Sequence, residues 1–208
     1  MSRTGVRSPN RRVGAKSSQT RNRIVQTADE LLDEEGLAAV TTSRIAARVG
    51  LKRPIVHYYF RTIEELIVAI LRRREGIVVE MLETALNSDE PLNVFKAVSD
   101  PKAAAAIHDM SAFALRSDTI RAVGRECLER VVALQTRALE IELKKRKVKA
   151  KISPVAVAIF VSILNQALAA QRTLGVAIAQ QELAGIVRRV LNSYLKTGGL
   201  FTESRRVK

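Results

Sequence analysis

The stretch from Thr41 to Leu66 constrains the fold more than any other part of the chain. Its apolar residues Ile45, Val49 and Val56 are spaced so that two short helices would turn them toward a common core. Gly50 stands where a tight turn between two helices needs a residue without Cβ strain. This spacing predicts a helix-turn-helix.

The pattern predicts a first helix near 42–49 and a second helix near 53–59, joined by a turn at 50–51. Propensity alone would make residues 55–60 a strand, because they are rich in β-branched and aromatic side chains. The helix-turn-helix spacing outweighs that local preference. We therefore expect the second helix to present polar and aromatic side chains on its outer face, as a DNA-reading helix does.

The same run resembles the N-terminal domain of the TetR family of transcriptional regulators. The matching positions are Thr41-Thr42, Ile45-Ala46, Gly50-Leu51, Lys52, His57-Tyr58-Tyr59-Phe60, Glu64 and Leu66. Three positions depart from the pattern: Lys52, Pro54 and Ile63 stand where the family often has Ser or Thr, Gly and Lys. The resemblance covers the first third of the chain. It implies a dimeric regulator of a palindromic operator, most often a repressor that a small molecule releases from DNA.

Two kinds of DNA contact are expected, since phosphate contacts set the register and base contacts carry sequence information. The residues expected at phosphates are Thr42, Arg44, Tyr58, Tyr59 and Arg61. Those expected at bases are Lys52, Arg53 and His57, with Ile55 placed to meet a thymine methyl group. For Tyr59 and Phe60, support of the core is the alternative role.

The charge of the chain favours a polyanionic partner. The formal net charge is +14, and the first 28 residues hold seven basic and no acidic side chains. Such a balance favours nucleic acid or an anionic membrane surface. Residues 1–19 have no apolar period and are predicted to be a disordered basic tail. Whether that tail contacts DNA or is simply solvated stays open.

The rest of the pattern predicts an all-α protein, with a three-helix head joined by a long helix to a helical body. The helix-turn-helix domain is expected over 20–66, with Thr20 as the first cap. Thr62 and Glu65 form a capping box before a long helix near 63–86. The ligand-binding and dimerisation domain is expected over 67–208. Its helices are predicted near 92–98, 101–116, 119–147, 154–173 and 180–197.

The last two predicted helices indicate a homodimer. The 154–173 helix is apolar nearly all round, and the 180–197 helix has a broad apolar stripe, so both need cover. Pairing them with their copies in a second subunit would form a four-helix interface, as the family does. The most apolar run, 155–164, is too short to span a bilayer. We expect a cytoplasmic protein without a membrane partner.

The body is expected to hold a small apolar effector, since the chain is poor in aromatic residues. The candidate lining residues are Phe95, His108, Met110, Phe113 and Asn165, with ordinary core packing as the alternative for each. No nucleophile elbow, phosphate loop or metal-ligand spacing is present, and Cys127 is the single cysteine. The sequence therefore predicts no enzyme, cofactor or metal site. The rival function is a constitutive architectural DNA-binding protein without an effector.

Overall fold

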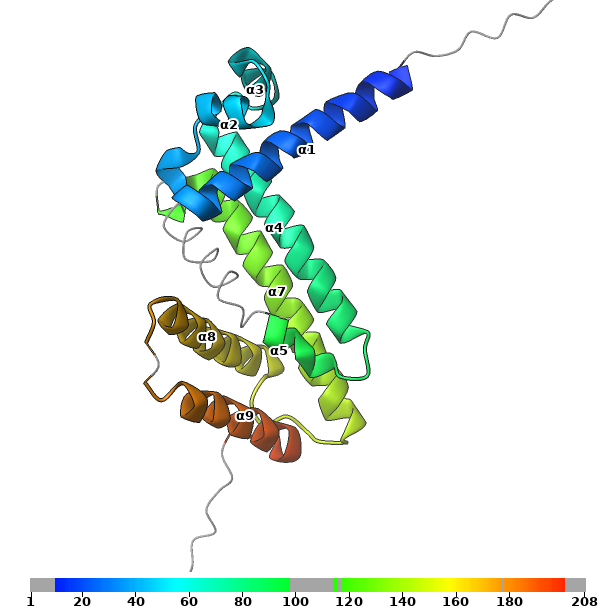
Figure 1. Cartoon of the computed structure of the whole chain (residues 1–208). Coiled ribbons are helices and arrows are strands. Elements are labelled where there is room, and N and C mark those ends of the chain that lie inside the picture. The colour runs from blue at the N-terminus through cyan, green and yellow to red at the C-terminus, as the bar shows by residue number, and fades with distance from the viewer. Residues whose placement is uncertain (1–9, 98–113, 116, 177, 201–208) are drawn as a thin grey trace, which may run out of the picture. The chain divides into compact units, whose positions relative to one another are not determined.

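The computed structural model describes residues 10–97, 114–115, 117–176 and 178–200, and all regular elements in this part are helices (Figure 1). The predicted all-α class is therefore confirmed for the described residues. The chain divides into two compact units, Met1–Arg73 and Arg74–Lys208. In order, the elements are α1 (Asn10–Glu35), η1 (Leu37–Ala39), α2 (Thr42–Val49), α3 (Arg53–Tyr59), α4 (Ile63–Leu86), η2 (Pro91–Asn93), α5 (Val94–Ala97), α7 (Asp118–Lys145), α8 (Pro154–Thr173) and α9 (Gln180–Thr197).

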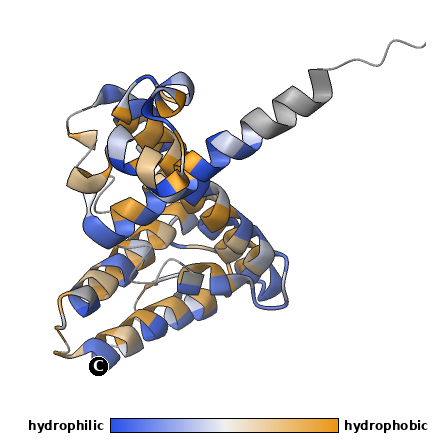
Figure 2. Cartoon of the chain, turned by 45° about the horizontal axis from the view of Figure 1, so that its top comes forward, coloured by the Kyte–Doolittle hydropathy of each residue, from blue (hydrophilic) through white to orange (hydrophobic). Residues whose placement is uncertain are grey.

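The N-terminal unit packs α1, α2, α3 and the beginning of α4 around one core. Figure 2 shows hydrophobic and hydrophilic residues alternating around the helices, as amphipathic packing requires. The buried side chains of this core include Ile24, Ala28, Leu31, Ile45, Val49, Val56, Phe60, Leu66 and Ile70. This core holds α2 and α3 in place, so it positions the predicted DNA-reading helix.

The predicted bounds of α2 and α3 are confirmed, whereas the start of the first helix differs. α1 begins at Asn10, well before the predicted cap at Thr20. Residues 10–19 are therefore helical, and the prediction of a disordered tail over 1–19 is wrong for them. The sequence of that segment has no apolar period, so no core-facing stripe indicates a helix there. Residues 1–9 lie outside the described residues.

The C-terminal unit packs α7, α8 and α9 together with α5 and the end of α4. Its core includes Leu82, Phe95, Leu139, Val161 and Tyr194. In Figure 1, α8 and α9 lie side by side, and their bounds are those predicted. The helix predicted near 119–147 is α7, which Ser117 caps by accepting a hydrogen bond from the backbone N–H of Ile120. The helix predicted near 101–116 falls on residues that are mostly outside the described part.

α8 has one face in this core and one face exposed. Val157, Ala158 and Val161 are buried, whereas the side chains of Val155, Ile159, Phe160 and Ile163 are exposed. Residues 154–172 are long and apolar enough to cross a membrane by length and composition alone. The apolar run is thus longer than 155–164, on which the sequence argument relied. Core helices of soluble proteins pass the same test, so this is weak evidence for a membrane.

Candidate DNA-binding site and effector pocket

The turn between α2 and α3 is made by backbone geometry that only glycine adopts easily. Gly50 has φ 72° and ψ 35°, in the left-handed region. Its N–H donates to the carbonyl of Ala47 at 3.3 Å, and the N–H of Leu51 donates to the carbonyl of Ala46 at 2.8 Å. This pair of bonds is a Schellman ending, which satisfies the last carbonyls of α2 and redirects the chain. The predicted turn at residues 50–51 is confirmed.

A side-chain cap marks the start of α2, and a proline in the first turn marks the start of α3. The Thr41 hydroxyl accepts a hydrogen bond from the backbone N–H of Arg44 at 3.3 Å. α3 begins after Lys52, whose side chain makes no capping bond, and Pro54 lies in its first turn. Proline suits that position because its fixed φ is already helical and no N–H is lost there. The departure at Lys52 therefore leaves α3 without a side-chain cap, and the departure at Pro54 is compatible with the helix.

α3 has one buried residue and one half-buried residue, and its other residues are exposed to solvent. Val56 is fully buried, which fixes the rotation of the helix. Arg53 and His57 are exposed and, being four residues apart, share one face of α3. Lys52 and Ile55 are also exposed. All four predicted base-contacting residues are therefore accessible, with Arg53 and His57 on one face of α3 and Ile55, two residues from each, on another side.

The two tyrosines of α3 separate into different environments. The side chain of Tyr58 is 79% exposed, whereas Tyr59 is half-buried and packs against the core of the N-terminal unit. Their rings meet edge to face, with centroids 5.2 Å apart. Phe60 is buried and carries the guanidinium of Arg21 over its ring, 4.8 Å from the centroid. Phe60 therefore supports the core of the N-terminal unit, as considered from the sequence.

Two arginines of α2 form ion pairs with the end of α1. Arg44 pairs with Glu35, and Arg48 donates to both carboxylate oxygens of Glu34 at 2.7 and 2.9 Å. The hydrogen bond to Glu34 raises the pKa of the Arg48 guanidinium above its usual value. Arg44 is a predicted phosphate contact, and Glu35 competes with any phosphate for the same guanidinium. Sequence reasoning missed this pair, since nothing in the local pattern brings residues 35 and 44 together.

The two remaining predicted phosphate contacts are Arg61, just before α4, and Thr42, at the start of α2. The Thr62 hydroxyl accepts a hydrogen bond from the N–H of Glu65 at 3.1 Å, as the predicted capping box requires. The Glu65 carboxylate accepts from the N–H of Arg61 at 2.8 Å rather than from that of Thr62. The side chain of Arg61 is exposed, and that of Thr42 at the start of α2 is half-buried.

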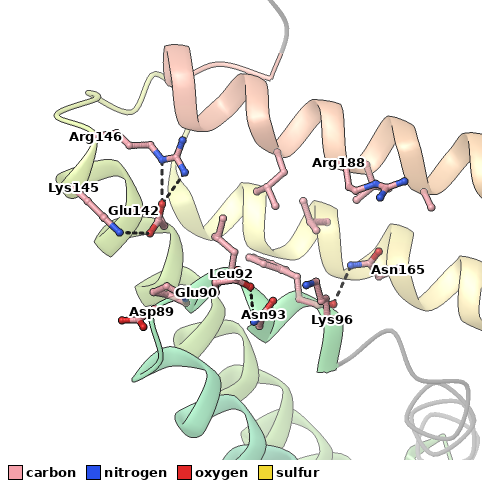
Figure 3. A pocket seen from close by; sticks show the side chains of 16 residues that line it. Asp89, Glu90, Leu92, Asn93, Lys96, Glu142, Lys145, Arg146, Asn165 and Arg188 are labelled. Atoms are coloured by element: carbon pink, nitrogen blue, oxygen red, sulfur yellow. Dashed lines mark hydrogen bonds and ion pairs between the residues drawn. The ribbon is translucent and has the colours of Figure 1, made fainter.

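A pocket of about 650 Å³ lies in the C-terminal unit, among η2, α5, α7, α8 and α9 (Figure 3). Phe95 and Asn165, two of the predicted effector-pocket residues, line it, and the Asn165 amide donates to the Phe95 carbonyl at 3.3 Å. His108, Met110 and Phe113 lie outside the described residues. Sequence reasoning missed the charged residues of the wall, because they come from segments far apart in the chain. The charged lining residues are Asp89, Glu90, Lys96, Glu142, Lys145, Arg146 and Arg188.

The described residues include no group of three or more His, Cys, Asp or Glu side chains that could hold a metal ion. The chemistry of the N-terminal unit is instead that of an exposed, cationic and aromatic helix held on a helix-turn-helix. These features define a helix-turn-helix DNA-binding protein.

Comparison with known proteins supports this class and shows which family the N-terminal unit resembles. Residues 24–70 match the family model described as bacterial regulatory proteins, tetR family. No curated protein sequence matches the chain. The matched segment contains α2, the turn, α3 and the beginning of α4, which is the unit built above.

Solved structures show the same fold over most of the chain. A transcriptional regulator from Saccharomonospora viridis, solved in complex with choline, has a TM-score of 0.71 at 19% identity, covering 82% of this chain and 96% of that one. A TetR transcription regulator from Haloarcula marismortui has a TM-score of 0.70 at 20% identity, covering 86% and 97%. A TetR-family regulator from Mesorhizobium loti has a TM-score of 0.70 at 16% identity, covering 86% and 96%. This chain is a DNA-binding transcriptional regulator whose N-terminal unit matches the tetR family, and its fold is that of these solved regulators.

Proposed function

We propose that this regulator is a repressor that binds a palindromic operator as a homodimer and leaves it when a small-molecule effector binds the body. The observation that carries the proposal is the exposed face of α3. Arg53 and His57 are exposed there, Lys52 is exposed just before the helix, and the buried Val56 fixes the rotation of α3. Arginine and lysine read guanine through its major-groove acceptors, and such pairs discriminate between bases.

Around this face, the contacts divide by their chemistry. Lys52, Arg53 and His57 contact bases, and Ile55 meets a thymine methyl group. The phosphate contacts in this proposal come from Thr42, Arg44, Tyr58, Tyr59 and Arg61. Tyr58 is the more accessible tyrosine, so its hydroxyl carries more of the phosphate contact than that of the half-buried Tyr59. The helix-turn-helix domain spans 20–66 and the effector and dimerisation domain spans 67–208.

The homodimer is supported by apolar surface that the described residues leave open. On α8, Ile159, Phe160 and Ile163 are exposed, and on α9, Leu183 and Ile186 are partly exposed. Large apolar side chains gathered on neighbouring helices mark an interaction surface, since water-exposed apolar area is unfavourable. A second copy of α8 and α9 would cover them in a four-helix interface. Two-fold symmetry would then match a palindromic site.

The effector is supported by the pocket in the C-terminal unit. An architectural protein without an effector would need no such cavity, and about 650 Å³ is within the range of small-molecule sites. The charged wall argues against the purely apolar effector expected from composition. The protein acts in the cytoplasm, where its DNA target is, and performs no catalysis.

The decisive experiment is selection of bound sequences from a random duplex pool at fixed ionic strength, with the oligomeric state measured by light scattering. A palindrome recovered with a dimeric protein is the expected result. Recovery of no preferred sequence would favour the architectural alternative. A monomer that recovers single half-sites would contradict the homodimer. Release of the selected duplex is then followed by fluorescence anisotropy during titration of candidate effectors.

A further inference from the structure

The pocket of the C-terminal unit has two chemically different ends. Figure 3 shows Asp89, Glu142, Lys145 and Arg146 toward one end, and Lys96, Asn165 and Arg188 toward the other. We call these the paired end and the cationic end. The pocket is also lined by apolar side chains, including Leu92, Phe95, Val161, Val187 and Leu191.

At and beside the paired end, the carboxylates of Glu142 and Glu90 are already engaged. Arg146 donates twice to one oxygen of the Glu142 carboxylate, at 2.9 and 3.1 Å, and Lys145 lies 4.0 Å from the other oxygen. The Glu90 carboxylate accepts a hydrogen bond from the Asn93 amide at 3.0 Å. Because Glu142 is buried, its two cationic neighbours are needed to stabilise its charge. This end is therefore largely self-neutralised.

At the cationic end, the two positive charges have no acidic partner. Lys96 on α5 and Arg188 on α9 form no ion pair with any described residue, and no acidic residue lines their end of the pocket. Asn165 donates one amide N–H to the Phe95 carbonyl, which fixes the amide and leaves its second N–H as a donor. Two cations and an amide N–H beside an apolar wall match an anionic head group on an apolar body.

We propose that this pocket binds an amphipathic monocarboxylate. Its carboxylate lies between Lys96 and Arg188, where the guanidinium fork can bind both oxygens. Its apolar body lies along Phe95, Val161 and Val187. A dianionic phosphate monoester fits less well, because Asp89 and Glu90 line the same cavity and repel a second negative charge. The proposal rests on the effector-binding role of the body and names the chemical class of the effector.

The test measures binding by calorimetry in the absence of DNA, so that it does not depend on operator release. The probes are decanoate, decan-1-ol and decyltrimethylammonium, which share one apolar chain and differ in head-group charge. Decanoate is expected to bind at least about 10-fold more tightly than the other two, because charge-assisted hydrogen bonds are the strong ones. Equal binding of decan-1-ol, or tighter binding of the cationic probe, would overturn the proposal.

Adjacent arginines on α9 provide a matched pair of variants. Arg188→Gln removes a lining charge, whereas Arg189→Gln removes the same charge from the neighbouring exposed residue, which does not line the pocket. Arg188→Gln is expected to weaken decanoate binding about 10-fold or more, and Arg189→Gln to change it less than about 2-fold. Equal losses in both variants would show that only the general charge of α9 matters, and would refute the site.

A third variant tests the cavity itself. Ala184→Phe places a bulky ring in the pocket from the lining face of α9 and should abolish decanoate binding while circular dichroism stays unchanged. Unaltered binding would place the ligand elsewhere and overturn the proposal. Decanoate binding that depends on Arg188 but leaves the operator complex intact would support this site and contradict the release mechanism. The two proposals therefore fail separately.

Discussion

Replacing Glu35 by Gln should tighten DNA binding, because Glu35 holds the guanidinium of Arg44 in the free protein. The side chains of Arg44 and Glu35 are 48% and 40% exposed, so their pair is a surface ion pair. Such pairs contribute about 0.2–1 kcal/mol. If phosphate must displace Glu35 in both subunits, the penalty doubles to about 0.4–2 kcal/mol, or roughly 2- to 30-fold in affinity.

The assay is fluorescence anisotropy with the selected operator, at two salt concentrations. Glu34→Gln is the matched control: it removes the same charge one residue earlier, but its partner Arg48 is not a proposed DNA contact. It should change affinity only through the long-range field, and less at high salt. In an Arg44→Ala background, Glu35→Gln should lose most of its effect, because the competition no longer exists.

Two outcomes would refute this reasoning. If Glu34→Gln and Glu35→Gln tighten binding equally, the gain is a general charge effect and the Arg44 pair is irrelevant. If Glu35→Gln keeps its full effect in the Arg44→Ala background, the carboxylate repels phosphate directly rather than occupying the arginine. A double-mutant cycle gives the coupling energy between the two residues from the same four proteins.

The remaining predictions concern base reading, the C-terminal unit and its pH dependence. His57→Ala should relax preference at one position of each half-site with little change at others; a uniform loss across all duplexes in the selection assay would place His57 at phosphate instead. Gly198→Ala should destabilise the protein by more than Gly175→Ala in urea unfolding. Both glycines have φ above 70°, which alone costs about 1–2 kcal/mol, but only at Gly198 would the added Cβ meet backbone, 2.1 Å from the Lys149 carbonyl oxygen; equal costs would contradict this. Burial raises the pKa of the Tyr194 hydroxyl in the folded protein, so as pH rises this group ionises first in the unfolded chain. The free energy of unfolding therefore keeps its full value below pH about 10 and falls as pH rises from there through the pKa of the folded protein. Tyr194→Phe should reduce the fall of the free energy of unfolding with pH in this alkaline range. An unchanged pH dependence would assign the fall to other groups.

The helices could be predicted from the sequence because local signals agree with one another. Ser153 before Pro154 marks a helix start, and the structure shows the Ser153 hydroxyl accepting a hydrogen bond from the N–H of Ala156 at 3.2 Å. Gly50 marks the turn before α3 for an equally local reason. The bounds of α2, α3, α4, α8 and α9 were therefore predictable to the residue.

The ion pairs and the pocket wall could not be predicted in the same way. Arg188 and Lys96 reach one cavity from helices separated by about half the chain, and no periodicity encodes which surface side chains meet. Composition suggested an apolar effector because it counts residue types without placing them. The early start of α1 escaped prediction for a related reason, since a polar helical extension has no core-facing stripe to reveal it.

On the proposed assignment, different parts of the N-terminal unit control the phosphate contacts and the base contacts. A chain with a formal net charge of +14 is drawn to any duplex, because counterion release does not depend on sequence. Competition by Glu35 weakens the Arg44 contact by the same factor on every duplex, so it leaves the ranking set by α3 unchanged. An operator that is already saturated loses little occupancy when its affinity falls by such a factor. The occupancy of the far more numerous, unsaturated non-specific sites falls by the whole factor. The face of α3 therefore sets which duplex is preferred, and the Arg44–Glu35 pair limits how strongly other DNA competes for the protein.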